Sequence, residues 1–357
     1  MTPLAQLERA FALRAQDVSC EGQPLVGLFG DGLPEALIAG AGARCVEVKA
    51  PPLGCQMMSD VVREIAEPFL DVFAARFLHR FATGAFDAYA LIIFARDDVA
   101  GLTAYQYACE LRRLGHVSNR GPKLHLWNLL HQESTAAQAF NQLEYDRLIP
   151  ALEAATGQAF DSTRIAKAQA DEALRAGAID RLKAHPDIFV LRNAGRWLSA
   201  QTHAALLDQI PAAKPPQHPR RIGLIGTACD TPVLHGLAAE FGTLQRDLTP
   251  YGDLWPGCHA GPQALPELLH AVASQPIHIR TNPPERFDRA LDDALAPCDL
   301  IIASVDANDD SFGWEVPGLK ARATARGQSF VSLAFRPHSP DAAWIDAARS
   351  AIKAALT

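Results

Sequence analysis

The chain has 357 residues, which at about 150 residues per domain corresponds to roughly two or three domains. Its 48% hydrophobic and 20% charged residues are typical of globular proteins and exclude extensive disorder. The 33 basic and 40 acidic residues give a formal net charge of −7. The chain therefore lacks the generally cationic surface that binds nucleic acid or an anionic membrane.

Neither a membrane span nor an export signal is indicated. The longest apolar stretch, Ala88–Ala95, is far shorter than the roughly 20 residues of a spanning helix. The first ten residues lack the basic-then-apolar order of a signal peptide. We therefore predict a cytoplasmic protein. Its seven cysteines include no C-x-x-C pair, so neither a zinc ribbon nor a thioredoxin-type dithiol is indicated, and most should be buried thiols.

The first part of the chain is typical of an α/β unit. Residues 1–20 are predicted to form an N-terminal helical segment, and residues 21–132 the first unit. Short apolar strands are predicted at 24–30, 44–48, 87–98 and 123–127. Within residues 59–81, Ile65, Phe69, Phe73 and Phe77 recur at i,i+4 spacing, which predicts a core-facing helix that Pro68 starts or kinks.

The second part repeats this order of elements. Residues 133–210 show no convincing strand and are predicted to form a helical insert. Residues 211–219 contain four prolines and form a stiff linker. A second unit, 220–357, has predicted strands at 221–226, 243–248, 298–306 and 329–333. Short continuous apolar strands that alternate with helices indicate parallel sheets covered on both faces. We predict an α/β fold with two Rossmann-like, doubly wound units.

Parallel sheets place ligands beyond the carboxyl ends of their strands. This rule selects the loops that begin at 29–34, 95–98, 226–230 and 305–310, which line one cleft if the two units face each other. The predicted substrate-binding residues in these loops are Asp31, Arg96, Asp97, Asp98 and Asp306. Helix capping is the competing interpretation of the aspartates.

Two residues are candidates for catalysis. Cys229 precedes a predicted helix, whose dipole would stabilise its thiolate. His131 follows a strand and is the best general-base candidate by residue type, although a hydrogen-bonded core histidine is the commoner case.

Metal ligation competes with capping and turn formation at two further places, and we predict no metal ligands. Asp306, Asn308, Asp309 and Asp310 carry oxygen atoms of the kind that Mg²⁺ prefers, and Cys258-His259 has the donor types of a metal site. No G-x-G-x-x-G loop, P-loop, H-E-x-x-H or G-x-S-x-G motif is present.

Several sequence strings follow one another in a characteristic order. Residues 26–43 read VGLFGDGLPEALIAGAGA and residues 84–98 read GAFDAYALIIFARDD. They are followed by LGH at 114–116, LHLW at 124–127, FNQLE at 140–144, PCDLII at 297–302 and GQSFVSL at 327–333. Over roughly residues 24–340, this order resembles the 2-hydroxyacyl-CoA dehydratase and benzoyl-CoA reductase family.

The resemblance implies a [4Fe–4S] cluster held by three cysteines per subunit. It also implies an ATP-dependent activator that delivers one electron, giving a ketyl radical that expels the hydroxyl group of an acyl-CoA. This chain departs from that pattern, because Arg96 stands where the family has a cysteine before the aspartate. The other two expected regions, 76–80 and 304–314, contain no cysteine either, and thiolates are what hold such clusters.

Two interpretations follow from the resemblance. Either the chain is a cluster-less subunit of a heteromeric enzyme, or it uses Cys55, Cys229 and Cys258, whose spacing matches no cluster motif. We favour the first. The implied partners are a homologous dehydratase subunit and an activator ATPase, and the implied ligand is an acyl-CoA thioester bound between the units, with Arg96 against an anionic group. The alternative is a non-catalytic ligand-binding or scaffold protein of the same architecture.

Overall fold

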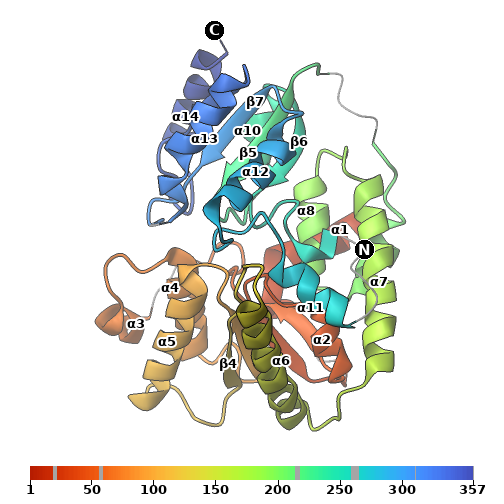
Figure 1. Cartoon of the computed structure of the whole chain (residues 1–357). Helices are drawn as coiled ribbons and strands as arrows, with labels where there is room; N and C mark the ends of the chain where they lie inside the picture. The colour runs from red at the N-terminus through yellow and green to blue at the C-terminus, as the bar shows by residue number, and fades with distance from the viewer. Residues whose placement is uncertain (19–21, 56–58, 214–217, 259–264, 310, 357) are drawn as a thin grey trace. The chain divides into compact units, whose positions relative to one another are not determined.

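The computed structural model describes residues 1–18, 22–55, 59–213, 218–258, 265–309 and 311–356 (Figure 1). Its eight named strands form two four-stranded, all-parallel sheets flanked by helices, which confirms the predicted α/β class and its repeat. The chain divides into two compact units. The first comprises Met1–Lys183, Val190–Pro211 and Pro256–Gln275, and the second Ala184–Phe189, Ala212–Trp255 and Pro276–Thr357.

The first sheet has the strand order β2-β1-β3-β4. Its strands are β1 (Leu25–Phe29), β2 (Arg44–Glu47), β3 (Tyr89–Ala95) and β4 (Lys123–Trp127). Phe29 is paired with Phe94, and Ala95 with Trp127, so β1, β3 and β4 end at the same level. The loops that follow these three strands therefore meet at one edge of the sheet.

Helices cover both faces of the first sheet. On one face Val26 and Ile93 pack with Leu37 of α2 and Leu148 of α6. On the other face, Phe77 of α4 makes edge-on contacts with the rings of Phe29 and Phe94, each at 5.3 Å between centroids. The helices of this unit are α1 (Pro3–Leu13), α2 (Glu35–Gly40), α3 (Asp60–Ile65), α4 (Val72–Ala82), α5 (Val99–Arg113), α6 (Thr135–Thr156), α7 (Ser162–Arg181), α9 (Ala200–Leu207) and α11 (Leu265–Ala273). Between α7 and α9, α8 (Ile188–Asn193) begins in residues of the second unit and ends in the first, and the 3₁₀ turn η2 (Ala194–Arg196) follows it.

The segment predicted as one helix over 59–81 forms two helices, α3 and α4. The break between them contains Pro68, and Asp71 caps α4 by accepting the Ala74 N–H at 3.0 Å. Phe73 and Phe77 are buried as predicted, but Phe69 is 71% exposed because it lies in the break and not on the buried helix face. The expected core role of Phe69 is therefore wrong.

The second sheet repeats the topology, with the order β6-β5-β7-β8. Its strands are β5 (Arg221–Gly226), β6 (Thr243–Leu248), β7 (Leu300–Ser304) and β8 (Ser329–Ser332). Helices α10 (Val233–Ala239) and α14 (Ala342–Ala354) contribute to one hydrophobic cluster, and α12 (Pro284–Leu295) and α13 (Val316–Ala325) to another. Both clusters include residues of β5 and β7, so this sheet is also covered on both faces.

The connecting segments are helical where they are described. Residues 135–207 contain α6 to α9, as the predicted insert requires. The second half of the chain also supplies α11 to the first unit, where Leu268 packs with Ala36 and Ile165. Residues 214–217 of the predicted linker lie outside the described residues. Within the described ranges, no helix is both long enough and apolar enough to cross a membrane.

Candidate functional site

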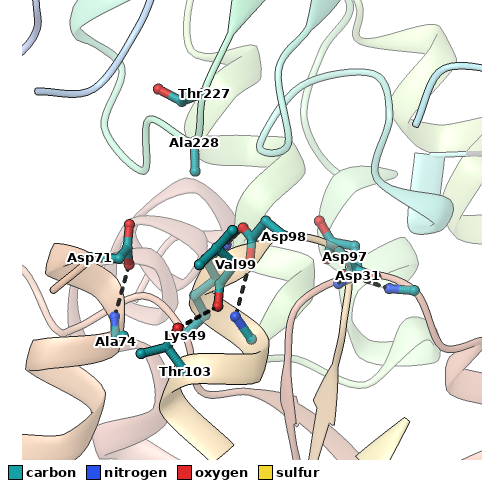
Figure 2. Close-up of polar contacts among 12 residues, drawn as sticks. Asp31, Lys49, Asp71, Ala74, Asp97, Asp98, Val99, Thr103, Thr227 and Ala228 are labelled. Atoms are coloured by element: carbon teal, nitrogen blue, oxygen red, sulfur yellow. Dashed lines mark hydrogen bonds and ion pairs between the residues drawn. The ribbon is translucent and has the colours of Figure 1, made fainter. Parts of the chain in front are cut away.

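Polar side chains gather at the carboxyl edge of the first sheet (Figure 2). We define the first-sheet edge by Asp31, Lys49, Asp97, Asp98 and Arg196. Asp31 follows β1, Lys49 follows β2, and Asp97 and Asp98 follow β3. Arg196 lies in η2. The predicted residues Asp31, Asp97 and Asp98 are therefore brought to one edge, together with two cations that were not predicted.

The loop after β1 wraps around the carboxylate of Asp97. Oδ2 of Asp97 accepts the N–H groups of Asp31 and Gly32 at 2.5 and 2.9 Å. Gly30 has φ = 103°, which favours glycine, and a Cβ on Gly32 would lie 2.1 Å from Asp97 Oδ1. Glycines at 30 and 32 thus let the backbone close on this carboxyl group.

Trp127 at the end of β4 holds the same loop from another side. Its Nε1 donates to the carbonyl oxygen of Gly32 at 2.8 Å. The carbonyl oxygen of Trp127 accepts the N–H of Arg96 at 2.9 Å, which fixes the backbone just before Asp97. The side chain of Arg96 is partly exposed at this edge.

Asp98 has two roles. Its Oδ1 caps α5 by accepting the Gly101 N–H at 3.0 Å, and its Oδ2 accepts from Lys49 Nζ at 2.6 Å. The capping interpretation of Asp98 is therefore confirmed, and the same carboxylate also forms an ion pair.

Lys49 is a buried cation at this edge, with a side chain only 7% exposed. Its Nζ lies 5.7 and 5.3 Å from the ring centroids of Phe29 and Phe73. Although burial lowers the pKa of Lys49, the carboxylates of Asp98 and Asp71 raise it above its ordinary value, so the ammonium stays charged.

Two buried charged side chains lie near Lys49. Arg80 of α4 donates to the carbonyl oxygens of Val48 and, at 3.3 Å, of Lys49. Glu47 at the end of β2 accepts the Ala50 N–H at 2.9 Å. Burial raises the pKa of Glu47, and Arg196 opposes this effect. These contacts fix the backbone on both sides of Lys49.

Asp31 is held by a guanidinium from the helical insert. Nη1 and Nη2 of Arg196 donate to Oδ1 and Oδ2 of Asp31 at 2.5 and 3.2 Å. The Arg196 side chain is 2% exposed, and its Nε donates to Asn193 Oδ1 at 2.9 Å. This two-pronged geometry is the strong form of an arginine–carboxylate pair.

Asp97 lies between carboxylates that already have cation partners. Burial, followed by the negative charge of Asp31, raises the pKa of Asp97 to about 7, against the opposing effect of the Asp31 N–H. Asp98 raises it further, whereas Lys49 lowers it. Asp97 is thus poised to exchange a proton near neutral pH, the property expected of an acid–base group.

His131 lies in the loop that follows β4 and is 5% exposed. Asn141 of α6 fixes this loop, because it exchanges two hydrogen bonds with the backbone of Leu130 at 2.8 and 3.0 Å. A general-base role for His131 stays a prediction.

The corresponding edge of the second sheet is built differently. We define the second-sheet edge by Thr227, Ser304, Asp306 and Arg336. Arg336 is 1% exposed, and its guanidinium donates to Ser304 Oγ at 2.8 Å and to the Ala228 carbonyl oxygen at 2.5 Å. Asp306 accepts the Asn308 N–H at 3.0 Å, and its own N–H donates to Thr227 Oγ1 at 2.7 Å. Asp306 thus orders the loop after β7.

The structure does not support the expected thiolate of Cys229. The residue is 6% exposed and belongs to the hydrophobic cluster that includes β5 and α10. Burial raises the pKa of Cys229, and the nearby Arg336 only partly opposes this effect. Burial therefore disfavours the thiolate form that a nucleophile needs, and a catalytic role for Cys229 stays a prediction.

Asp306 and Asp309, which were considered for metal ligation, both accept backbone N–H groups. Asp309 accepts N–H groups of Phe312 at 3.2 Å and Gly313 at 2.7 Å, so it caps the short turn after β7. His259 and Asp310 lie outside the described residues. In the part of the chain that the structure describes, no group of three or more His, Cys, Asp or Glu side chains could hold a metal ion.

The described thiols do not fit a three-cysteine cluster. Cys229 lies in the hydrophobic core of the second unit, and among the described residues Cys55, Cys229 and Cys258 form no group that could hold a metal ion. The partly exposed Arg96 and the loop after β7 likewise offer no thiolate at the positions that the resemblance implies. The donor set thus disagrees with an iron–sulfur centre among these residues.

Comparison with known proteins adds no family assignment. The chain matches no model of a known protein family, and a search of curated proteins finds no match.

Sequence reasoning missed Lys49 and Arg196. Lys49 lies just after a predicted strand, so the rule that selected the loops after four other strands would have found it. Arg196 lies in the helical insert, about 165 residues from Asp31, and nothing local marks it as a partner of that residue.

Proposed function

We propose that this chain is a cluster-less protein related to 2-hydroxyacyl-CoA dehydratase subunits, and that it binds an acyl-CoA thioester at the first-sheet edge. The observation that carries the proposal is that three of the resembling strings meet at one point. The 26–43 string supplies Gly32, the 84–98 string supplies Asp97, and the 124–127 string supplies Trp127. Gly32 is hydrogen-bonded to both of the others.

The chemistry of this edge supports a ligand with both polar and apolar parts. Lys49 and Arg96 supply positive charge beside the carboxylates. Large apolar side chains are exposed in the segments that follow β2 and precede α4 and at the start of α5: Leu53 is 47%, Phe69 71% and Val99 50% exposed. An acyl group would bury such surface, which is the main favourable term in binding apolar ligands.

The proposal includes a cellular setting. We place the protein in the cytoplasm, where thiols such as Cys229 and Cys298 stay reduced. The partners we propose are a homologous subunit with the complete set of cluster cysteines and an activator ATPase, which would together supply the electron chemistry that this chain lacks.

Replacing Arg96 tests the ligand site. Titration with lactoyl-CoA, a simple 2-hydroxyacyl thioester, should give about tenfold weaker binding for Arg96→Ala than for the wild type, because a charged hydrogen bond to the ligand is lost. The matched control is Arg120→Ala, an exposed arginine in the loop before β4, at the opposite end of that strand. Its affinity should stay within twofold.

Three results would count against the proposal or narrow it. Absence of wild-type binding to lactoyl-CoA would refute it, and equal affinities of both variants would remove Arg96 from the site. The non-catalytic alternative is favoured by the disagreement between the thiols and an iron–sulfur centre.

Purification from the native cell separates the two roles: a co-purifying subunit with complete cysteines supports a dehydratase assembly, and a lone thioester-binding chain supports a binding module.

A further inference from the structure

We infer that His235 is a general base, oriented by Asp247, which activates water for the hydrolysis of activated carboxylic esters and thioesters. His235 lies in the first turn of α10, and Asp247 is the second-last residue of β6. Leu248 of β6 is paired with Ile225 of β5, so Asp247 lies near the carboxyl end of the second sheet, where α/β proteins bind ligands. The inference is independent of acyl-CoA binding at the first-sheet edge.

The His235–Asp247 pair is short and buried. Nε2 of His235 lies 2.7 Å from Oδ2 of Asp247, and the two side chains are 9% and 3% exposed. The other oxygen, Oδ1, accepts the N–H and the hydroxyl group of Thr249 at 3.1 and 2.7 Å. A Cβ on residue 252 would lie 2.4 Å from this oxygen, so Gly252 lets the loop after β6 close on the carboxylate. The fixed carboxylate in turn fixes the orientation of the imidazole.

The hydrogen bond of the pair leaves Nδ1 of His235 as the reactive atom. A carboxylate only accepts hydrogen bonds, so the imidazole proton belongs on Nε2, and Nδ1 keeps a lone pair. Among the described residues, Nδ1 has no hydrogen-bond partner, and it is not a fully buried atom. The ring of Phe189 packs against the imidazole at 4.9 Å between centroids and helps to hold it in place. A water molecule can therefore donate a hydrogen bond to Nδ1.

The first unit shows that a helix packs on its sheet at this position without a polar pair. Helix α2 follows β1 as α10 follows β5, and the third residue of α2 is Leu37, where α10 has His235. Leu37 is 0% exposed and belongs to the hydrophobic core. Burying a histidine and a carboxylate costs desolvation free energy that an apolar contact does not cost. The polar pair thus points to a chemical role of His235.

The inferred reaction transfers one proton and exchanges one bond. Nδ1 of His235 takes a proton from water while the water oxygen bonds to the carbonyl carbon of the ester. The bond from this carbon to the leaving oxygen or sulfur then breaks, and the imidazolium gives its proton to the leaving group or the solvent. Ester and water thus become carboxylic acid and alcohol or thiol, without an oxidant or a reductant. Asp247 stabilises the transient imidazolium, as the aspartate of a catalytic triad does.

Hydrolysis of p-nitrophenyl acetate at pH 8, followed by the release of p-nitrophenolate, tests the inference. A reagent of this size needs access to Nδ1 and not a preformed pocket. We compare wild type with His235→Gln, because the amide N–H of glutamine can still donate to Asp247 but the side chain has no counterpart of Nδ1. The second-order rate constant of the wild type should exceed that of His235→Gln by at least about tenfold.

A matched control isolates this histidine from the other eleven in the chain. His116→Gln changes an exposed histidine that follows α5 in the first unit. Its rate constant should stay within about twofold of the wild-type value, because an exposed imidazole without a carboxylate partner adds little to the hydrolysis.

The role of Asp247 as a positioning residue has a spectroscopic signature. In Asp247→Asn, Oδ1 keeps the hydrogen bonds from Thr249, and the amide N–H group faces Nε2 of His235. Nε2 then has to accept, so the imidazole proton moves to Nδ1. Nitrogen-15 NMR should find the proton on Nε2 in the wild type and on Nδ1 in Asp247→Asn, and the rate constant of this variant should fall to that of His235→Gln. A merely structural Asp247 would not move the proton.

The outcomes are distinct from those that test the proposed function. Equal rate constants of wild type and His235→Gln, or a wild-type imidazole with its proton on Nδ1, would overturn the inference. If circular dichroism shows that His235→Gln is unfolded, the proton position in the wild type and the rate constant of Asp247→Asn still decide. Absence of lactoyl-CoA binding would refute the proposed function and leave this inference standing.

Discussion

The carboxyl edges of the two sheets have the same topology and different chemistry. In the first, two ion pairs, Asp31–Arg196 and Lys49–Asp98, are formed by residues that follow different elements. In the second, the single guanidinium of Arg336 is satisfied mainly by neutral oxygens, which include the Ala228 carbonyl. The two sheets share one topology, but the first-sheet edge has two ion pairs, whereas the second-sheet edge is organised around one buried arginine.

Gly30 follows β1 and Gly226 ends β5, and both have a positive φ. The atoms around these two glycines differ between the two edges. Gly226 has φ = 139°, and a Cβ there would lie 1.8 Å from the carbonyl oxygen of Ser304. Gly30 has φ = 103°, and a Cβ there would meet Asp97 Oδ2 at 2.6 Å. The obstacle is fixed backbone in the second unit and a side chain in the first.

Alanine at these two positions should have unequal costs, and Gly226→Ala is the largest effect we expect. Both changes force a side chain into a conformation that costs about 1–3 kcal/mol, and only Gly226→Ala adds a clash with backbone. We expect a loss of at least about 3 kcal/mol in the free energy of unfolding for Gly226→Ala and about 1–2 kcal/mol for Gly30→Ala. Urea denaturation followed by circular dichroism measures both.

The controls for this pair are glycines with open space around them. At Gly236 in α10 and Gly177 in α7, one in each unit, an added Cβ would have no neighbouring atom within 4 Å. Alanine at either position should leave stability unchanged or raise it by about 0.5–1 kcal/mol. Equal losses for Gly226→Ala and Gly30→Ala would contradict the distinction between the two edges.

Local patterns were sufficient to predict the repeat of the fold. The first and third strands of each half are short apolar runs, and each strand has a counterpart in the other half, so both four-stranded sheets were expected before the structure. The same logic brought Asp31, Asp97 and Asp98 together, because parallel strands end at one edge. These features depend on residues that are close in sequence or on a general rule of sheet topology.

The parts that could not be predicted depend on contacts between distant segments. Arg196 pairs with Asp31 across 165 residues, and α11 packs on the first unit although it follows the first strands of the second. The burial that raises the pKa of Cys229 is likewise a tertiary effect, which the nearby helix start did not reveal. Such ion pairs, helix contacts and burial effects are determined only by the packing of the folded chain.

A second comparison concerns the fourth strand of each sheet. Trp127 ends β4 and Arg336 follows β8, and each donates a hydrogen bond to the loop after the first strand of its sheet. Trp127 donates to the Gly32 carbonyl, and Arg336 to the Ala228 carbonyl and to Ser304 Oγ. Arg336→Met removes several bonds of a buried guanidinium and should cost about 2–3 kcal/mol of unfolding free energy. Trp127→Phe loses one neutral hydrogen bond and some volume, and should cost about 1–2 kcal/mol.

Arg336→Lys sharpens this comparison. An ammonium cannot reproduce the planar fork that reaches both acceptors, so it should recover less than half of the loss of Arg336→Met. Arg289→Met, an exposed arginine on α12, should change stability by less than about 0.5 kcal/mol. Full recovery with lysine would mean that the charge alone, and not the geometry, matters at the second-sheet edge.

The smallest expected effect is a pH dependence of stability that comes from Asp97 at the first-sheet edge. The folded-state pKa of Asp97 is raised to about 7 by burial and Asp31, whereas an unfolded aspartate titrates near 4. Between these values the folded chain holds a proton that the unfolded chain has released, so this residue's contribution to stability falls as the pH rises from about 4 to 7.

Asp97→Asn removes this titration and keeps the shape of the side chain. From pH 4.5 to pH 7.5, the wild type should therefore lose about 1–2 kcal/mol of unfolding free energy relative to Asp97→Asn. Glu172, whose pKa burial and Glu35 also raise to about 7, is present in both proteins and cancels. Parallel curves for wild type and Asp97→Asn would show that folding does not shift the pKa of Asp97.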